Sequence, residues 1–360
     1  MIETPFHEFE KARGADFGES HGWMIPRRFP RGRDGLAPAR LVAGIADLTA
    51  TGRIKITGAD RIDLLQRIST NDLSALGPGG FAPTLFVTAK GRIIDRALVI
   101  HRGDALLLLT APAGRERLRA WIERTIFSED FQMTDLSGET AAFALSGPGA
   151  ARIVSEVCGV RTAALAPGCS LNLPIADVET TVAPFDGLPS GWIFIAETPG
   201  IREVYAHVLR CAEPLGAIPI GEDDAEVLRV EAGIPADGHE LTEDWNPWEA
   251  GVRESFSLTK GCYTGQEVIA RLDTYEKVQR GLVGLRFGAA PELATPARVY
   301  GVDAAVGEKE LGMLTSAVAS DRFEETIGLA IIRRAFGTAG TAVTIGEGRL
   351  PAIVAELPFV

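Results

Sequence analysis

The chain has 360 residues, of which 46% are hydrophobic, 23% are charged and 7% are aromatic. These proportions exclude a mostly disordered or collagen-like chain, and the length predicts two or three domains with enough residues to bury a core. The 36 basic and 48 acidic residues give a net charge of −12. This charge argues against nucleic acid as a partner, because nonspecific nucleic-acid binders usually carry the opposite charge.

Neither a membrane segment nor an export signal is predicted. No apolar run approaches the ~20 residues that a membrane-spanning helix requires. Residues 1–11 mix acidic and apolar side chains and lack the basic and apolar segments of a signal peptide. The four cysteines are dispersed without any Cys-x-x-Cys motif, which favours a reducing compartment over a disulfide framework or a metal site. We therefore expect a cytoplasmic protein without a membrane partner or a bound metal.

Residues 51–136 predict a strand, a helix, three strands, a second helix and a final strand. Apolar side chains alternate over 53–57, and helical spacing follows over 58–68. Residues 139–220 repeat this order. In both segments the first strand ends in a hydroxyl residue and a glycine, which can cap the next helix and permit a sharp turn. We interpret the pair as two ferredoxin-like β-α-β-β-α-β modules in tandem, although any two α+β modules would look similar at this level.

The rest of the chain changes character twice. Residues 222–233 predict a helix, and residues 237–251 form a polar loop that contains two tryptophans. After residue 280 the pattern becomes short apolar runs interrupted by glycine, which is typical of a small all-β barrel or sandwich. The predicted fold class is therefore α+β, with tandem ferredoxin-like modules and a small C-terminal β-barrel.

The segment Lys260–Glu267, KGCYTGQE, carries the strongest chemical signal. It has the spacing of a capping box, so a helix is predicted to begin just after Thr264. Cys262 would then precede a helix N-terminus, where unpaired amides favour an anion, and Lys260 and Arg271 could add positive charge. These features lower the pKa of a thiol, and the thiolate is the form that attacks electrophiles or binds metal. The alternative is a small buried apolar residue, as free cysteine usually is.

The octet KGCYTGQE resembles the signature of YgfZ-type folate-binding proteins, which are relatives of the glycine-cleavage T-protein. The resemblance extends over nearly the whole chain. The further segments that carry it are Gly22–Pro26, Thr70–Asp72, Gly91–Asp95, Leu228–Pro235, Gly238–Leu241, Leu314–Ser316 and Leu357–Phe359. It implies three domains in a cloverleaf around a central cleft that admits tetrahydrofolate, which would be the cofactor.

The resemblance and the predicted elements together divide the chain into four parts. Residues 1–50 and 137–250 would form the first, T-protein-like folate-binding domain, and residues 51–136 the second, ferredoxin-like domain. Residues 251–280 would hold the signature loop and a helix that leads to the C-terminal β-barrel of residues 281–360.

Three positions depart from the T-protein pattern. T-proteins carry a pair of acidic residues after Gly-Gly-Ile-Ile, whereas this chain has Asp95 followed by Arg96. The resemblance also places Ala225 where T-proteins have an arginine, and Ile193 near a glutamate that contacts the pterin. Aminomethyl transfer needs a carboxylate to move protons at the folate nitrogens. The chain is therefore more similar to the YgfZ-type proteins than to T-proteins.

The candidate catalytic residues are Cys262, Lys260 and Asp95. The residues expected to hold tetrahydrofolate are Asn71, Asp95, Trp192, Arg229, Glu231, Tyr263, Gln266, Glu267 and Arg271. Asp95 lies at the end of a strand and could instead pair with Arg96. Arg229 and Glu231 are two positions apart on a helix, so at most one points into a site, and either could form a structural salt bridge.

Three functions are compatible with these residues. The first is a cytoplasmic folate-binding protein that supports assembly or repair of iron–sulfur clusters, with assembly or client proteins as partners. This role comes from the resemblance alone. Cys262 would act near the folate as a nucleophile or as a transient sulfur or iron ligand, because a single cysteine cannot hold a cluster. The second is a tetrahydrofolate-dependent aminomethyltransferase or a related one-carbon transferase, and the third is a scaffold protein without turnover.

Overall fold

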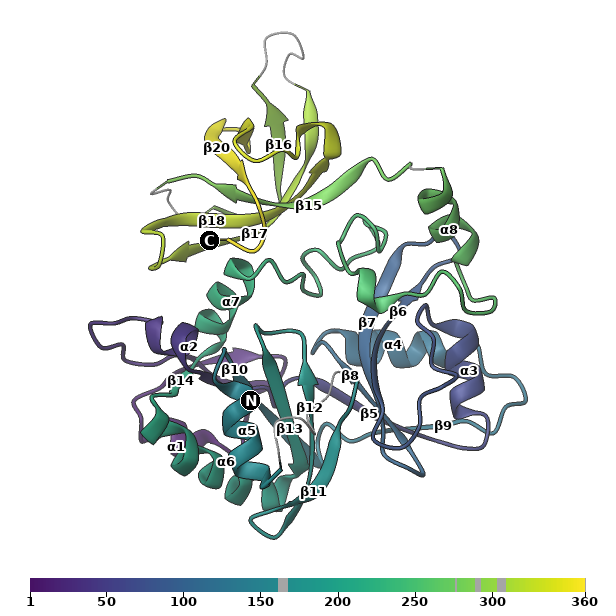
Figure 1. The fold of residues 1–360 in the computed structure, drawn as a ribbon, viewed down its shortest axis with the longest axis vertical. Helices are drawn as coiled ribbons and strands as arrows, with labels where there is room; N and C mark the ends of the chain where they lie inside the picture. The colour runs from purple at the N-terminus through teal and green to yellow at the C-terminus, as the bar shows by residue number, and fades with distance from the viewer. Residues whose placement is uncertain (161–167, 276, 289–292, 303–308, 360) are drawn as a thin grey trace.

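The computed structural model describes residues 1–160, 168–275, 277–288, 293–302 and 309–359. It has three main parts, and Figure 1 shows how they are arranged. An inserted module, residues 52–135, lies beside a central module, which is strand β4 together with residues 140–220. A β-barrel made by the C-terminal residues lies above both modules in this view.

The inserted module has the predicted order of elements. They are β5 (Gly52–Thr57), α3 (Arg61–Ile68), β6 (Phe81–Val87), β7 (Ile93–His101), β8 (Leu106–Thr110), α4 (Gly114–Glu123) and β9 (Gln132–Asp135). The strands form a five-stranded sheet in the order β6-β7-β8-β5-β9. Helices α3 and α4 cover one face of this sheet, where Leu64, Leu118 and Ile122 are buried in its core.

The central module repeats this topology around one additional strand. Its elements are β4 (Gly44–Asp47), β10 (Thr140–Ser146), α5 (Ala150–Cys158), β11 (Leu171–Ile175), β12 (Val178–Phe185), β13 (Gly191–Glu197), α6 (Thr198–Ala212) and β14 (Ile218–Ile220). The sheet order is β11-β12-β13-β10-β4-β14, so β4 lies between the strands equivalent to β5 and β9. The prediction of two like modules is confirmed, but each repeat has five strands instead of the four of a ferredoxin-like module.

The turns after β5 and β10 show why the two modules open alike. Gly58 and Gly147 have φ values of +107° and +127°, and a Cβ on either would collide with backbone atoms of a neighbouring segment. Glycine is therefore required at both turns, as predicted. The predicted helix caps are wrong: the Thr57 hydroxyl contacts the Gln132 side chain at 3.2 Å, and the Ser146 hydroxyl donates to a carbonyl at 3.0 Å.

The sheets of the two modules pack face to face, and this contact holds the modules together. Leu98 and Leu109 of the inserted module lie in one buried cluster with Ile193 and Ile195 of the central module. The remainder of the same face of the inserted sheet is covered by residues 241–269 through a second buried cluster. The signature loop therefore packs on the inserted module.

The N-terminal residues and α7 connect the central module to the barrel. The elements are β1 (Ile2–Glu3), α1 (His7–Lys11), β2 (Asp16–Ser20), β3 (Trp23–Arg28), α2 (Ala37–Leu41) and α7 (Glu222–Glu231). The three strands form a small sheet in the order β1-β3-β2. Figure 1 shows α7 beneath the barrel, and its Val230 lies in a buried cluster with Ile327, Leu329 and Phe359.

The C-terminal residues form a closed barrel, which settles the choice between a barrel and a sandwich. Its strands are β15 (Arg280–Arg286), β16 (Ala297–Gly301), β17 (Glu310–Ser320), β18 (Glu325–Arg333), β19 (Ala342–Ile345) and β20 (Leu350–Ala355). Short 3-10 helices lie at Glu213–Leu215, Arg253–Ser255 and Arg334–Phe336. Within the described ranges, none of the helices has both the length and the apolar character that a membrane crossing requires.

Helix α8 (Gln266–Thr274) follows the signature loop, but its start differs from the prediction. The N-cap is Gly265, with φ +79°, and no side chain caps the helix. A Cβ at this glycine would lie 2.6 Å from the carbonyl oxygen of Thr88. The predicted capping box is therefore wrong, because the close approach of this turn to the inserted module requires glycine at the cap.

Candidate functional site

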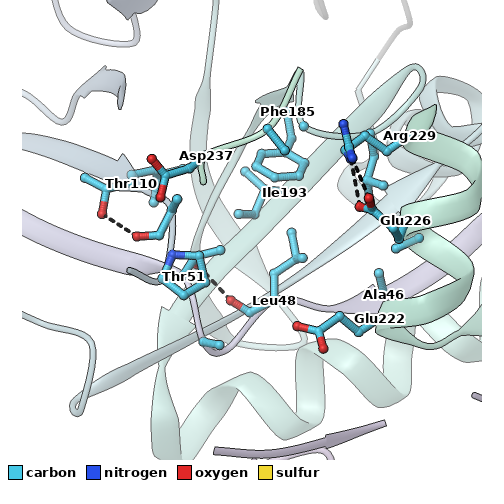
Figure 2. Close-up of a pocket in the computed structure, with 18 of the residues that line it drawn as sticks. Ala46, Leu48, Thr51, Thr110, Phe185, Ile193, Glu222, Glu226, Arg229 and Asp237 are labelled. Carbon is cyan, nitrogen blue, oxygen red and sulfur yellow. Dashed lines mark hydrogen bonds and ion pairs between the residues drawn. The ribbon is translucent and has the colours of Figure 1, made fainter. Parts of the chain in front are cut away.

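A cavity of about 530 Å³ lies where the two modules, α7 and the loop 235–241 meet. Its walls are mostly apolar. Figure 2 shows that Leu48, Phe185 and Ile193 lie in its middle, between Asp237 at one end and Glu226 at the other. Ligand sites are usually concave, largely apolar and 300–1,000 Å³ in volume, with a few polar groups that orient the ligand. The cavity is therefore the candidate functional site.

Four of the acidic side chains that line the cavity are paired with arginines. The pairs are Asp186 with Arg96, Glu222 with Arg27, Glu226 with Arg229, and Asp237 with Arg117. A carboxylate that is partly removed from water is stabilised when a cation and hydrogen bonds satisfy its oxygens. The pairing also reduces the net charge of the cavity, which suits an uncharged ring with hydrogen-bonding edges.

Arg96 lies in the cavity wall and joins three segments. Its guanidinium forms an ion pair with Asp186, in the turn between β12 and β13, where Nη1 donates to Oδ1 at 3.0 Å. Nη2 also reaches Glu254 Oε1 at 3.1 Å, and Nε donates to Ser255 Oγ at 3.0 Å. Arg96 thus connects both modules with residues 253–259, the linker that precedes the signature loop. It places a cation where the resemblance expects a second acid.

Asp95 lies on the other face of β7, away from the cavity. Its carboxylate is fully buried against the first turn of α4 and accepts a hydrogen bond from Arg117 Nη2 at 3.3 Å. Burial and the nearby charge of Asp237 raise the pKa of Asp95 to about 7, against the opposing effect of Arg117. Arg117 also donates to Asp237 Oδ1 at 2.6 Å, so it connects Asp95 to the cavity wall.

Arg229 lines the cavity, whereas Glu231 does not. Arg229 is almost fully buried, and in addition to its pair with Glu226 it donates to the carbonyl of Ile234 at 2.6 Å. The Glu231 carboxylate accepts two hydrogen bonds from Arg40, each at 2.8 Å, and one from Ser320 Oγ at 2.6 Å. Glu231 therefore forms a structural salt bridge, which was the alternative to its predicted role in binding tetrahydrofolate.

Trp192 and Asn71 also lie outside the cavity. Trp192 is 8% exposed and belongs to the core between the central sheet and its helices, because strand alternation turns it away from its cavity-lining neighbour Ile193. The Asn71 side-chain amide donates to the carbonyls of Pro83 at 2.7 Å and Glu254 at 2.9 Å. Its side chain thus fixes the linker to the inserted module.

The signature loop is anchored by the side chain of its lysine. Lys260 is buried, and its Nζ donates to the carbonyls of Ser69 at 2.8 Å and Asn71 at 2.6 Å. Burial lowers the pKa of Lys260 to about 8. Tyr263 is buried as well, and Gln266 Nε2 donates to the Lys260 carbonyl at 3.2 Å. These three side chains shape the loop, and none of them lines the cavity.

Cys262 is exposed at the surface of this loop. The expectation that it avoids burial is therefore confirmed, but Cys262 does not line the cavity. Glu267 and Arg271 are also exposed, and they face each other on α8 at 3.8 Å. Cys169 is likewise exposed, whereas burial raises the pKa of Cys158 to about 11. Cys262 is accessible to a partner from solvent, at a site separate from the cavity.

Sequence reasoning missed several residues of the cavity: Phe185, Asp186, Glu226 and Asp237. Glu226 precedes Arg229 by three positions on one helix, a spacing that predicts an ion pair and could have indicated it. Phe185 is the last residue of β12, and Asp186 and Asp237 lie outside the strands and helices, so their place depends on distant segments. Among the residues that the structure describes, no cluster of three or more His, Cys, Asp and Glu side chains could hold a metal ion.

Comparison with known protein families accounts for most of the chain. Residues 6–260 match the GCVT N-terminal domain, and residues 280–360 match the glycine cleavage T-protein C-terminal barrel domain. The first match includes both modules and α7, and the second coincides with the barrel. The chain therefore belongs to the glycine cleavage T-protein family.

Relatives match over most or all of this chain. An aminomethyltransferase from Bacillus pumilus is 30% identical over 100% of this chain and 98% of its own. A chloroplastic protein of Arabidopsis thaliana, named as a transferase, is 33% identical over 88% of this chain and 71% of its own. The crystal structure of the glycine cleavage aminomethyltransferase T from Bartonella henselae has a TM-score of 0.82 and 21% identity, covering 99% of this chain and 98% of that one. The T-protein resemblance is confirmed, and the YgfZ-type assignment within the family stays a prediction.

Proposed function

We propose that the protein binds tetrahydrofolate in the central cavity. The observation that carries this proposal is a cavity of about 530 Å³ with apolar walls, which include Leu48, Phe185 and Ile193, and carboxylates at its ends. The pterin ring of a folate is flat and carries N–H donors on one edge. Apolar faces and a carboxylate at the edge are therefore the groups expected to bind it. The resemblance to the T-protein family also implies tetrahydrofolate as the cofactor.

Tetrahydrofolate is expected to raise the melting temperature of the protein. A ligand that binds only the folded state stabilises it by about 2.7 kcal/mol at a hundred times its Kd. Ala225→Phe adds a ring at the cavity face of α7, where Ala225 is partly exposed, so it should abolish the shift. Ala120→Phe, at an exposed position of α4, is the matched control and should keep it. A shift that survives in Ala225→Phe would place the ligand elsewhere.

Within this folate-binding role, we propose support of iron–sulfur clusters in preference to aminomethyl transfer. Two features support this choice. The cavity wall carries Arg96 where a proton-accepting carboxylate is expected, and Asp95 is turned toward α4. Cys262 is exposed on the signature loop, where a partner protein can reach its thiol. A partner would supply the other ligands, because one cysteine cannot hold a cluster.

Cys262→Ser is expected to abolish this cellular role while leaving the fold and the response to tetrahydrofolate intact, since Cys262 is exposed and outside the cavity. The measurement is the activity of iron–sulfur enzymes in cells that depend on this chain. Cys169→Ser removes another exposed cysteine and should retain full activity. If the purified protein instead forms methylenetetrahydrofolate from an aminomethylated donor, and Cys262→Ser does so equally well, the aminomethyltransferase alternative is correct.

A further inference from the structure

The ion pair at one end of the cavity leaves part of its carboxylate unused. Glu226 and Arg229 are one turn apart on α7, and the guanidinium meets the carboxylate with two hydrogen bonds. Nε donates to Oε2 at 2.7 Å, and Nη2 donates to Oε1. Each carboxylate oxygen has two lone pairs, so one on each oxygen remains available. Figure 2 shows this pair at the edge of the apolar walls.

The arginine lies behind the carboxylate and is held in place on every side. The Arg229 side chain is 6% exposed, whereas that of Glu226 is 34% exposed. Arg229 also donates to the carbonyl of Ile234 at 2.6 Å, to Glu240 Oε2 at 3.1 Å and to Ser316 Oγ at 2.7 Å. With these partners Arg229 cannot turn toward a ligand. It fixes the Glu226 carboxylate and leaves the open side of that group toward the cavity.

Glu226 is also kept in its charged form. Burial raises its pKa, but the hydrogen bonds and the charge of Arg229 outweigh burial and hold the pKa below its ordinary value. A charged carboxylate accepts hydrogen bonds and does not donate them. Among the other acids that line the cavity, Glu222 is already bonded to both Ser20 and Arg27, and the Asp237 side chain is only 8% exposed.

We propose that Glu226, positioned by Arg229, recognises the N–H edge of the ring in the cavity, namely the amino-pyrimidinone edge of a pterin. This inference rests on the proposed folate-binding function and assigns its ring specificity to one carboxylate. Ile193 and Leu48 provide apolar contact for the faces of the ring, and Glu226 accepts hydrogen bonds from its edge. A ring that has a carbonyl at that edge would place a partially negative oxygen against the negative Glu226 carboxylate, and the two would repel each other.

The test compares pterin with lumazine, which has an oxygen in place of the 2-amino group. Calorimetric titration of the full chain should give about tenfold or tighter binding of pterin, the value of one hydrogen bond to a charged group. Glu226→Gln should reduce this preference to less than about threefold, because an amide presents both a donor and an acceptor. Glu123→Gln is the matched control, since Glu123 also pairs with an arginine one turn away, on α4 and outside the cavity.

The outcomes separate this inference from the function on which it rests. If Glu226→Gln keeps the full preference for pterin, Glu226 does not recognise the ring edge, although folate binding stands. If the wild type binds neither pterin nor tetrahydrofolate, the proposed function and this inference both fall. Glu226→Asp retains the charge, so it should retain part of the preference, and it provides the comparison if Glu226→Gln unfolds.

Discussion

Arg53→Met is expected to destabilise the protein by roughly 4 kcal/mol or more, a large share of the roughly 5–15 kcal/mol by which a typical domain is stable. Arg53 is fully buried, and its guanidinium donates hydrogen bonds without a directly bonded carboxylate partner in the described structure. The acceptors are the carbonyls of Thr49, Thr51, Ser137 and Thr140 and the hydroxyls of Thr51 and Thr140, which lie in or at the end of the two segments that connect the central and inserted modules. Methionine would leave several buried carbonyls without donors.

Urea unfolding of Arg53→Met and Arg119→Met measures this effect. Arg119 is about half exposed and pairs with Glu123 on the surface of α4, so its replacement should cost about 0.5 kcal/mol or less. A loss below about 1 kcal/mol in Arg53→Met would show that water replaces the guanidinium and that the connection between modules does not depend on it.

The order of elements was predictable because it depends on local spacing. Apolar alternation and helical spacing over 51–136 predicted each strand and helix of the inserted module, and Gly58 and Gly147 marked the turns that only glycine tolerates. The additional strand β4 could not be inferred in this way, since it joins the central sheet from a segment nearly a hundred residues earlier than its partner β10.

The cavity was harder to predict. Alternation along a strand shows which residues share a face of the sheet, but it does not show which face lines the cavity. Trp192 and Ile193 are neighbours on β13, and only Ile193 faces the cavity. Asp95 and Arg96 show the same ambiguity on β7. The signature octet could be recognised from its residues, but its position could not. It lies outside the cavity because residues 241–269 pack on the inserted sheet.

Arg229→Met is expected to cost about 3–5 kcal/mol, because it leaves a buried acid without its cation. Glu240 is fully buried, and it also accepts hydrogen bonds from Ala236 N at 3.0 Å and Ser316 Oγ at 2.7 Å. Ser316 belongs to β17 of the barrel, so the pair stabilises the seating of the barrel on α7 as well as the cavity end. The loss is measured by chemical unfolding.

The double variant Arg229→Met, Glu240→Gln separates the charge from the packing. Once the buried charge is removed with its partner, the double variant should be less destabilised than the sum of the two single variants by about 1 kcal/mol or more. Arg271→Met, which breaks an exposed pair with Glu267 on α8, should change stability by at most about 0.5 kcal/mol. Additive losses in the double variant would mean that Arg229 and Glu240 act independently and that no ion pair couples them.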